Sequence, residues 1–351
     1  MIRCVLIALV IILLFSGMLR ADEMRMPENT PRPLKIGMAV FVNNITKVND
    51  QAGTFDASLD LQLRWKNTDL AFNAQEMGTN RMEFNHDSAT QKLAAIWTPA
   101  LTLRNAAIQS LEQGFFIYAD GTVVLIQRVK GVFDAKYRLE AFPFDTQNLP
   151  VYIVSERYNT NQIALIQDQR DINNSGLSKE ISLLSWQPKG LKFVSTRMRG
   201  LNGQFYPEMQ AQIVLARLPT AYLLATLMPF FLVMLIPTIA TFFVKMEMDK
   251  RLSYCGSSIL ALVALSFTYS SRYAMLPPDS ITTQLIVIGS GYQIVLILLS
   301  VTIFNPNNDS RWFSNTFIIP EIISYLRWAI PLALIGLVLM RVLLISLIFP
   351  K

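Results

Sequence analysis

Four apolar stretches in the C-terminal part of the chain restrict the available folds more than any other feature. They run over about 222–244, 252–271, 281–304 and 328–349. Each is long enough to cross about 30 Å of hydrocarbon as a helix. Backbone N–H and C=O groups in a bilayer must be satisfied internally, and a helix does this within one segment. The sequence therefore predicts a bundle of four transmembrane helices within residues 219–351.

The residues before this bundle have a different character. The chain is 52% hydrophobic, yet 16% of its residues are charged, and most of the charges precede the first apolar stretch. Residues 54–65 alternate between polar and apolar side chains, as a half-buried strand does. Many short strands separated by Gly, Asn and Pro predict an exported β-sandwich over residues 22–218. The other expected strands are 121–126, 149–154, 163–166, 181–186 and 204–215.

The N-terminus has the organisation of a secretory signal peptide. Arg3 is followed by an apolar run from Cys4 to Phe15, and Ala21 is a plausible cleavage point. We expect residues 1–21 to be a signal peptide, with an uncleaved anchor as the alternative. Cys4 would leave with the signal and Cys255 lies in the second apolar stretch, so the exported domain has no cysteine pair for a disulfide.

The second apolar stretch carries a stripe of polarity along one face. Ser253, Ser257, Leu260, Ala264 and Phe267 follow one another at steps of three or four residues, so they share one side of a helix. Hydroxyls occupy its first half and apolar groups its second. Such a face lies against water or against another helix, and in a ring of copies it becomes a pore wall. The alternative is that its larger apolar members only pack against neighbouring spans.

Several functional classes are disfavoured by composition. The chain has one histidine, and it lacks a Gly-x-Ser-x-Gly motif, a phosphate-binding loop and the spacing of metal ligands, so we expect no enzyme, metal or cofactor. The net charge of +6 includes no basic run, so we expect no nucleic-acid partner. A membrane-anchored binding module explains the sandwich, but it does not explain four spans with a polar stripe.

One loop of the β region resembles a known family. Phe142-Pro143-Phe144-Asp145-Thr146-Gln147 is similar to the signature loop of the pentameric ligand-gated ion channels. Trp97-Thr98-Pro99, Asp120-Gly121, the pre-membrane Arg217 and the order of four spans also resemble that family, over essentially the whole mature chain.

The resemblance is to the bacterial members. Animal members bracket this loop with two cysteines, and Ala135 and Leu149 stand at those positions here. It implies a ring-shaped homopentamer in the bacterial inner membrane, with the N-terminal domain periplasmic and five copies of the second span around one axis. The serines would then form hydroxyl rings, and the apolar residues a constriction that gates by dewetting. Cation-rich loops after the first and third spans agree with that orientation.

Whether the expected pore selects cations or anions depends on the charged residues at its mouth. Cation-selective relatives carry a carboxylate just before the pore helix, and Asp249 stands near that position here. The insertion of anion-selective relatives is missing from residues 246–249. We therefore expect monovalent cations to permeate. One alternative is that Asp249 pairs with Lys250 or Arg251 and contributes little, and another is an anion-selective channel of the same family.

The resemblance also implies a route that couples the two modules. Arg217 would pair with Asp145 and Asp50, while the Phe142–Phe144 segment would press on the loop between the second and third spans, which contains Pro277. The alternative is interface packing without a switching role.

Agonists of this family bind between subunits among aromatic side chains. Glu156 and Tyr158 match a segment that carries a carboxylate and an aromatic ring in amine-gated bacterial relatives, and Phe205 and Tyr206 follow a flexible hairpin. An amine suits aromatic faces beside a carboxylate. An anion, protons, or simple packing of these side chains remain alternatives. His86, the single histidine, is expected on an exposed loop.

Overall fold

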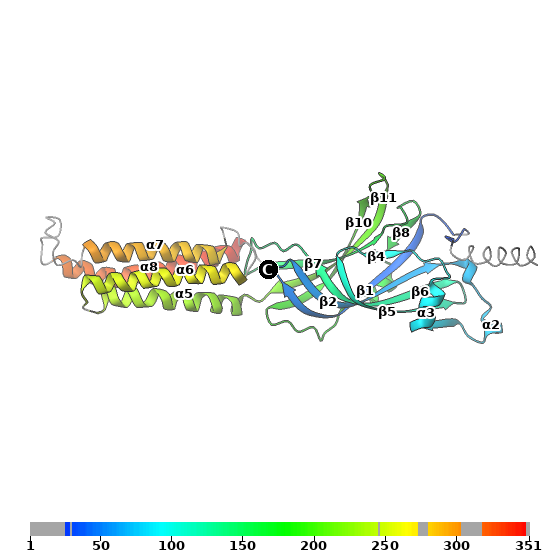
Figure 1. Ribbon diagram of the computed structural model, residues 1–351, viewed down its shortest axis with the longest axis horizontal. Helices are drawn as coiled ribbons and strands as arrows, with labels where there is room; N and C mark the ends of the chain where they lie inside the picture. The colour runs from blue at the N-terminus through cyan, green and yellow to red at the C-terminus, as the bar shows by residue number, and fades with distance from the viewer. Residues whose placement is uncertain (1–24, 29, 245, 273–279, 303–317, 349–351) are drawn as a thin grey trace, which may run out of the picture.

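The computed structural model describes residues 25–28, 30–244, 246–272, 280–302 and 318–348. Within these ranges a β-rich half is followed by a helical half, and the two lie end to end in an elongated molecule (Figure 1). The expected signal peptide and Pro277 fall outside the described residues.

The larger sheet forms one layer of the β half. Its order among the described residues is β3-β5-β6-β2-β1-β8, with β9 also paired to β1. Strand β2 alternates between buried and half-buried side chains along its whole length, as the sequence pattern predicts. The strands are β1 (Leu34–Asn49), β2 (Thr54–Lys66), β3 (Arg81–Asn85), β5 (Ala106–Tyr118), β6 (Thr122–Asp134), β8 (Ile163–Ile166) and β9 (Gly176–Leu177).

The second layer has the order β10-β11-β7-β4 in the described part of the chain. It consists of β10 (Trp186–Arg199), β11 (Phe205–Arg217), β7 (Thr146–Ser155) and β4 (Leu101–Leu103). The expected strand over 181–186 is wrong, because only Trp186 belongs to a strand. Ile181 is buried while Leu184 is fully exposed, so these apolar residues serve a turn that enters β10.

The core lies between the two sheets. It combines large side chains of the first layer, such as Phe55 and Phe133, with Ile153 and Ile213 of the second. The rings of Phe55 and Phe133 stack at 5.1 Å between centroids. Burying such rings is the main stabilising contribution of a sandwich core. The predicted β-sandwich is confirmed.

Helices α2 (Ala74–Met77) and α3 (His86–Leu93) lie at the end of the sandwich that is remote from the membrane helices (Figure 1). The other short helices of this half are η1 (Thr68–Leu70) and α4 (Gln169–Asn173), and α4 packs against β1. His86 opens α3 rather than a loop, it is exposed, and its φ of 53° lies in the left-handed region.

The helical half contains, within the described ranges, four apolar helices long enough to span a membrane. They are α5 (Pro219–Phe242), α6 (Met248–Arg272), α7 (Ile281–Thr302) and α8 (Ile318–Ile348). Helix α6 packs against both α5 and α7, while α8 packs mainly against α7. Helix α8 begins earlier in the sequence than the fourth apolar stretch, because its first turns are less apolar than the rest.

Candidate functional site

Arg217 is the last residue of β11 and lies at the junction with α5. Its Nε and Nη2 atoms donate to the two carboxylate oxygens of Asp145 at 2.7 and 3.1 Å, and Nη2 lies 2.7 Å from an oxygen of Asp50. The three side chains are almost completely buried. A buried guanidinium that meets two carboxylates in this geometry is held firmly, because removing one partner leaves an uncompensated charge.

Two aromatic rings flank the same guanidinium. The Cζ atom of Arg217 lies 4.1 Å from the centroid of Trp186 and 4.7 Å from that of Phe142. The ring of Phe142 in turn meets Tyr222 of α5 edge-on, at 4.4 Å between centroids. Sequence reasoning missed Trp186. The register of the β10–β11 hairpin pairs it with Arg217, so treating residues 186–217 as one hairpin would have found it.

Burial changes the acidity of Asp50. Desolvation raises its pKa above the ordinary 3.8, Arg217 opposes this, the Asp145 carboxylate adds to it, and the net pKa is raised. One Asp50 oxygen is buried and has no hydrogen-bond partner among the described residues. Asp50 is therefore the weaker of the two carboxylate partners of Arg217.

The loop before β7 reaches from the sandwich to the membrane helices. Phe142 and Pro143 are buried, and Phe142 packs in a small cluster with Leu139 and Tyr222. Phe144 is partly buried against the core of the helical half. The loop thus contacts α5 and the bundle core directly.

The Gln147 side chain closes this loop. Its amide oxygen accepts from the N–H of Arg138 at 3.0 Å, and its amide nitrogen donates to the Arg138 carbonyl and to Asp145, both at 2.6 Å. These bonds join the two flanks of the loop.

The predicted ligand-binding residues come from two segments that the structure brings together. The N–H of Thr160 donates to the carbonyl of Phe205 at 2.9 Å, and Asn159 donates to the side chain of Gln204 at 2.9 Å. The segment after β7 therefore lies beside the projecting β10–β11 hairpin (Figure 1).

Within these segments the aromatic side chains already have partners. Trp97 donates from its indole nitrogen to the Tyr158 hydroxyl at 2.9 Å. Arg197 lies over the ring of Phe205, at 5.9 Å from the centroid, and the hydroxyl of Tyr206 accepts from Asn202 at 2.8 Å. Glu156 is exposed, as is nearly half of Phe205. Of the four predicted ligand-binding residues, Glu156 and Phe205 are thus the exposed ones, while Tyr158 and Tyr206 are partly buried.

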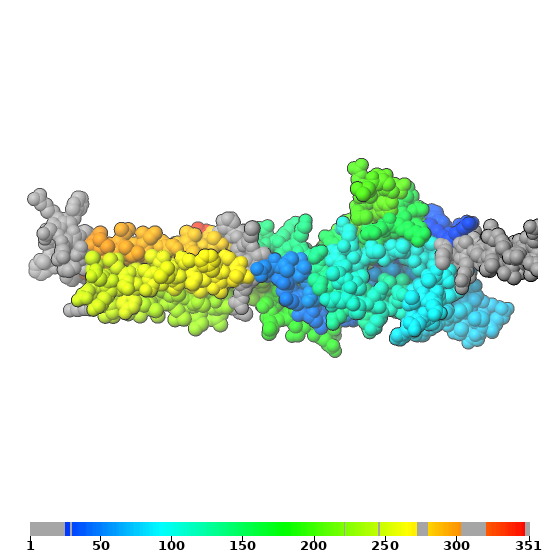
Figure 2. All heavy atoms as spheres, viewed as in Figure 1, coloured from blue at the N-terminus to red at the C-terminus, as the bar shows by residue number. Residues whose placement is uncertain are grey.

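Helix α6 separates its two faces as the sequence pattern predicts. The stripe residues are exposed in the single subunit, with Leu260 and Phe267 each 72% accessible. The opposite face carries Cys255, Ser258 and Leu262, which are buried against α5 and α7. Figure 2 shows the atoms of α6, in yellow, forming an uncovered ridge along the helical half. The exposed stripe residues are Asp249, Ser253, Ser257, Leu260, Ala264 and Phe267.

The charged residues Asp249, Lys250 and Arg251 lie in the first turn of α6. Lys250 pairs with Glu247 at 3.2 Å, and Arg251 is buried. Asp249 is exposed and forms no ion pair with any other described residue.

Comparison with known proteins identifies the family. The family model of the neurotransmitter-gated ion-channel ligand binding domain matches residues 14–219. The chain belongs to this family. It is a pentameric ligand-gated ion channel of the Cys-loop superfamily, and the expectation of a channel rather than an enzyme is confirmed.

Several members of the family align with most of this channel chain. A proton-gated ion channel of Gloeobacter violaceus is 21% identical over 74% of this chain and 70% of its own length. A neuronal acetylcholine receptor subunit alpha-9-II of Oncorhynchus mykiss is 21% identical over 80% of this chain and 49% of its own length. An acetylcholine-gated chloride channel subunit of Caenorhabditis elegans is 20% identical over 73% of this chain and 56% of its own length. The chain thus spans only about half the length of the animal receptor subunits that it matches.

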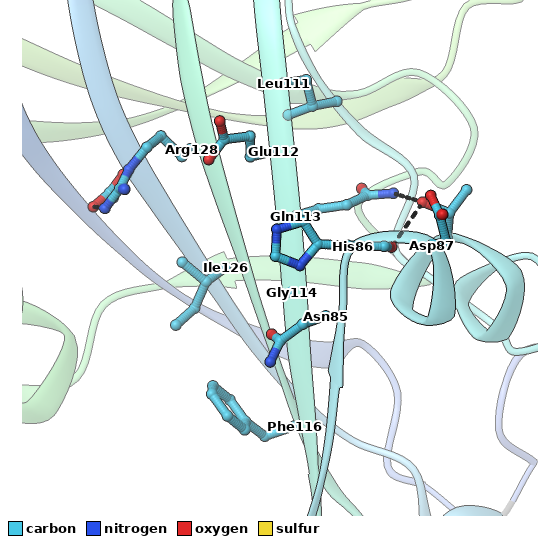
Figure 3. A pocket seen from close by; sticks show the side chains of 12 residues that line it. Asn85, His86, Asp87, Leu111, Glu112, Gln113, Gly114, Phe116, Ile126 and Arg128 are labelled. Atoms are coloured by element: carbon cyan, nitrogen blue, oxygen red, sulfur yellow. Dashed lines mark hydrogen bonds and ion pairs between the residues drawn. The ribbon is translucent and has the colours of Figure 1, made fainter.

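The channel chain also has a hollow that sequence reasoning did not predict. It has a volume of about 450 Å³ and lies over β5, β6 and the start of α3. Figure 3 shows His86 and Gln113 at one side of it and Arg128 at the other. Arg128 donates to both oxygens of Asp60 at 2.9 and 3.1 Å. Asp60, Asp87 and Glu112 make the lining more acidic than basic.

Proposed function

We propose that five copies of this chain form a gated cation channel in which α6 lines the ion path. The observation that carries this proposal is the division of α6 into an uncovered stripe and a buried face. A chain of the multi-pass channel family needs one helix per subunit with a face left free for water. Helix α6 presents the hydroxyls of Ser253 and Ser257, followed by three apolar side chains, along such an exposed face.

In the pentamer the stripe residues take distinct roles. Ser253 and Ser257 form hydroxyl rings that partly replace the hydration shell of an ion. Leu260, Ala264 and Phe267 form apolar rings, and a narrow apolar ring that loses its water blocks ions without a plug. The gate therefore lies in the half of α6 near the β-sandwich.

We propose that the channel selects monovalent cations. A ring of five Asp249 carboxylates concentrates cations at the mouth of the pore. The pairing of Lys250 with Glu247 supports this, because it leaves Asp249 free of its nearest cation. An anion-selective channel is the second candidate, and the chloride channel subunit among the relatives is the reason to test it.

Coupling between the modules runs, in this proposal, through Arg217 and the Phe142–Phe144 loop. Arg217 ends β11 directly before α5, so a movement of the hairpin pulls on the first membrane helix. Asp145 and Asp50 hold it from two other loops, and Phe142 links it to Tyr222. Pro277 is included in this proposed route only because of the family resemblance.

The stimulus is proposed to be a small amine or protons. Glu156 and Phe205 supply a carboxylate and an exposed aromatic ring on neighbouring segments, with Tyr158 and Tyr206 behind them. Protons are supported by the raised pKa of Asp50, which burial shifts upward, and by the proton-gated relative. We place the homopentamer in a bacterial inner membrane, with the β-sandwich in the periplasm after removal of residues 1–21.

Reconstitution of the purified protein into planar bilayers tests the proposal. Currents are recorded under a salt gradient while the pH is stepped and a panel of small amines is applied. We expect gated currents whose reversal potential follows the cation gradient. Reversal at the chloride potential would favour the anion channel, and complete absence of conductance would favour a membrane-anchored binding module.

The pore face has its own test. Ser257 is replaced by cysteine in a Cys255→Ala background, and a water-soluble methanethiosulfonate is applied. We expect Ser257→Cys to react and to reduce the current. Lack of reaction in both resting and stimulated protein would contradict the assignment of α6.

A further inference from the structure

Helix α5 contains a break in its backbone hydrogen bonding at Pro237. Proline has no N–H, so the carbonyl of Val233, four residues earlier, loses its partner within the helix. In hydrocarbon no water replaces that partner, and the carbonyl needs a donor from a neighbouring helix.

Helix α6 provides this donor. Ser258 of α6 donates from its hydroxyl to the Val233 carbonyl at 2.8 Å. Gln293 of α7 donates from its side-chain nitrogen to the Ser258 hydroxyl, also at 2.8 Å. Ser258 is 6% exposed and Gln293 is fully buried. Three helices are thus joined by one chain of hydrogen bonds.

The donors and acceptors in this series of hydrogen bonds follow from the chemistry of the three groups. The Val233 carbonyl can only accept, so the single hydroxyl hydrogen of Ser258 is used there. Ser258 can then only accept from Gln293, which must present its NH₂ group. The amide oxygen of Gln293 is consequently turned away and finds no hydrogen-bond partner among the described residues.

A second hydroxyl of α6 meets the other proline region of α5. Tyr269 donates to the carbonyl of Thr226 at 3.1 Å, next to the carbonyl of Ala225 that Pro229 leaves without an N–H. At about 100° per residue, Tyr269 lies within roughly 20° of Ser258 around the α6 axis. Both contacts therefore hold the same face of α6 against α5.

This face is opposite the stripe. Ser258 lies about 160° from Leu260 and about 180° from Phe267 around the axis, again at about 100° per residue. Turning α6 would separate the Ser258 hydroxyl from the fixed Val233 carbonyl and leave three buried polar groups without partners. The bonds therefore favour one rotational setting of α6.

We propose that Ser258 and Gln293 are positioning residues, which determine through the Val233 carbonyl which side chains α6 presents to the pore. This rests on the proposed function, in which α6 lines the ion path. Neither residue touches the permeating ion, so their effect must reach the pore by rotation of the helix.

The test compares the accessibility of two neighbouring positions of α6. Full-length protein is reconstituted in vesicles with Cys255→Ala, and Ser257→Cys and Gly256→Cys are each labelled with a water-soluble methanethiosulfonate. Both positions are exposed, and a side chain added at Gly256 meets no atom within 4 Å in the subunit. We expect Ser258→Ala to change the ratio of the two labelling rates by up to about threefold, the effect of losing an ordinary hydrogen bond between membrane helices.

Control variants separate rotation from general loosening. Ser258→Thr keeps the hydroxyl and should keep the native ratio. Ser300→Ala removes a buried hydroxyl that donates to Leu296 of its own helix at 2.8 Å, and it should also keep the ratio. In a Pro237→Ala background the Val233 carbonyl regains a partner within α5, so Ser258→Ala should have a smaller effect there.

The outcomes distinguish the two proposals. If neither cysteine reacts, α6 does not line a water-filled path and the proposed function fails. If both react and Ser258→Ala leaves the ratio as Ser300→Ala does, the pore remains and the positioning role is overturned. If Ser258→Ala protein does not fold, Gln293→Leu is measured in its place, and an unchanged ratio there has the same meaning.

Discussion

The two halves of this chain bury polar groups by different means. In the β-sandwich, the guanidinium of Arg217 is buried as an ion and is paired with two carboxylates and two aromatic rings. In the helical half, Ser258 and Tyr269 are buried as neutral groups that donate to backbone carbonyls of α5, and the buried amide of Gln293 donates to Ser258.

The difference follows from the surroundings. A charge buried near the edge of a sandwich can be paired on several sides, which offsets the free-energy cost of removing it from water. Burying a charge deep in hydrocarbon costs far more free energy. The ionic cluster therefore sits at the junction and not within the spans. The junction is thus held by charge-assisted hydrogen bonds, while α5, α6 and α7 are linked by hydrogen bonds between neutral groups.

The largest expected effect comes from removing the ion at the junction. Arg217→Ala leaves Asp145 and Asp50 buried and unpaired, which should destabilise the protein by about 3–5 kcal/mol. We expect exported protein with little or no current, measured by surface labelling and by bilayer recording. The control is Arg128→Ala, which breaks an exposed pair with Asp60 and should change stability by no more than about 1 kcal/mol. Normal gating of Arg217→Ala would refute the coupling role.

A smaller effect is expected at the aromatic side of the cluster. Trp186→Leu removes the ring face over Arg217 but preserves the ion pairs, and a desolvated cation–π contact contributes about 2 kcal/mol. Trp186→Phe keeps a weaker ring and should lie between the two. Thermal unfolding in detergent measures both variants. Equal stability of the Leu and Phe variants would mean that the ring contributes only by packing.

The smallest expected effect is the dependence of folding stability on pH. Because burial raises the pKa of Asp50, the folded protein holds this proton more tightly than the unfolded chain, whose pKa is about 3.9. Stability should therefore fall as pH rises from about 4 through the raised pKa of Asp50. Asp50→Asn stays neutral and should lose this slope, measured by unfolding midpoints between about pH 4 and pH 7.

Asp120 should give a pH dependence of stability with the opposite sign, and it serves as the comparison for Asp50. A hydrogen bond from Lys66 lowers its pKa to about 2, so its contribution is present above about pH 4 and is lost as the pH falls toward 2. Asp120 is well exposed, so the contribution is small. A pH slope of the same sign for both carboxylates would contradict the burial of Asp50.

Much of the architecture could be predicted because it depends on local patterns. The apolar length of each span, the alternation along β2 and the stripe on α6 are properties of short segments. The pairing of Arg217 with Asp145 was expected from the resemblance alone, since 72 residues separate the two in the sequence. The wrong strand over 181–186 shows the limit, because a short apolar run can equally serve a buried turn.

The sequence by itself determined which segments are long and apolar enough to cross the membrane, that Ser253 and Ser257 share one face of α6, and where Pro237 interrupts α5. Tertiary structure alone decided that Trp186 covers Arg217, that Trp97 occupies the hydroxyl of Tyr158, and that Ser258 and Gln293 complete the broken helix. The physical reason is that a short stretch of sequence shows which buried polar group needs a hydrogen-bond or ionic partner. Which group becomes that partner depends on the register and packing of segments far apart in the chain.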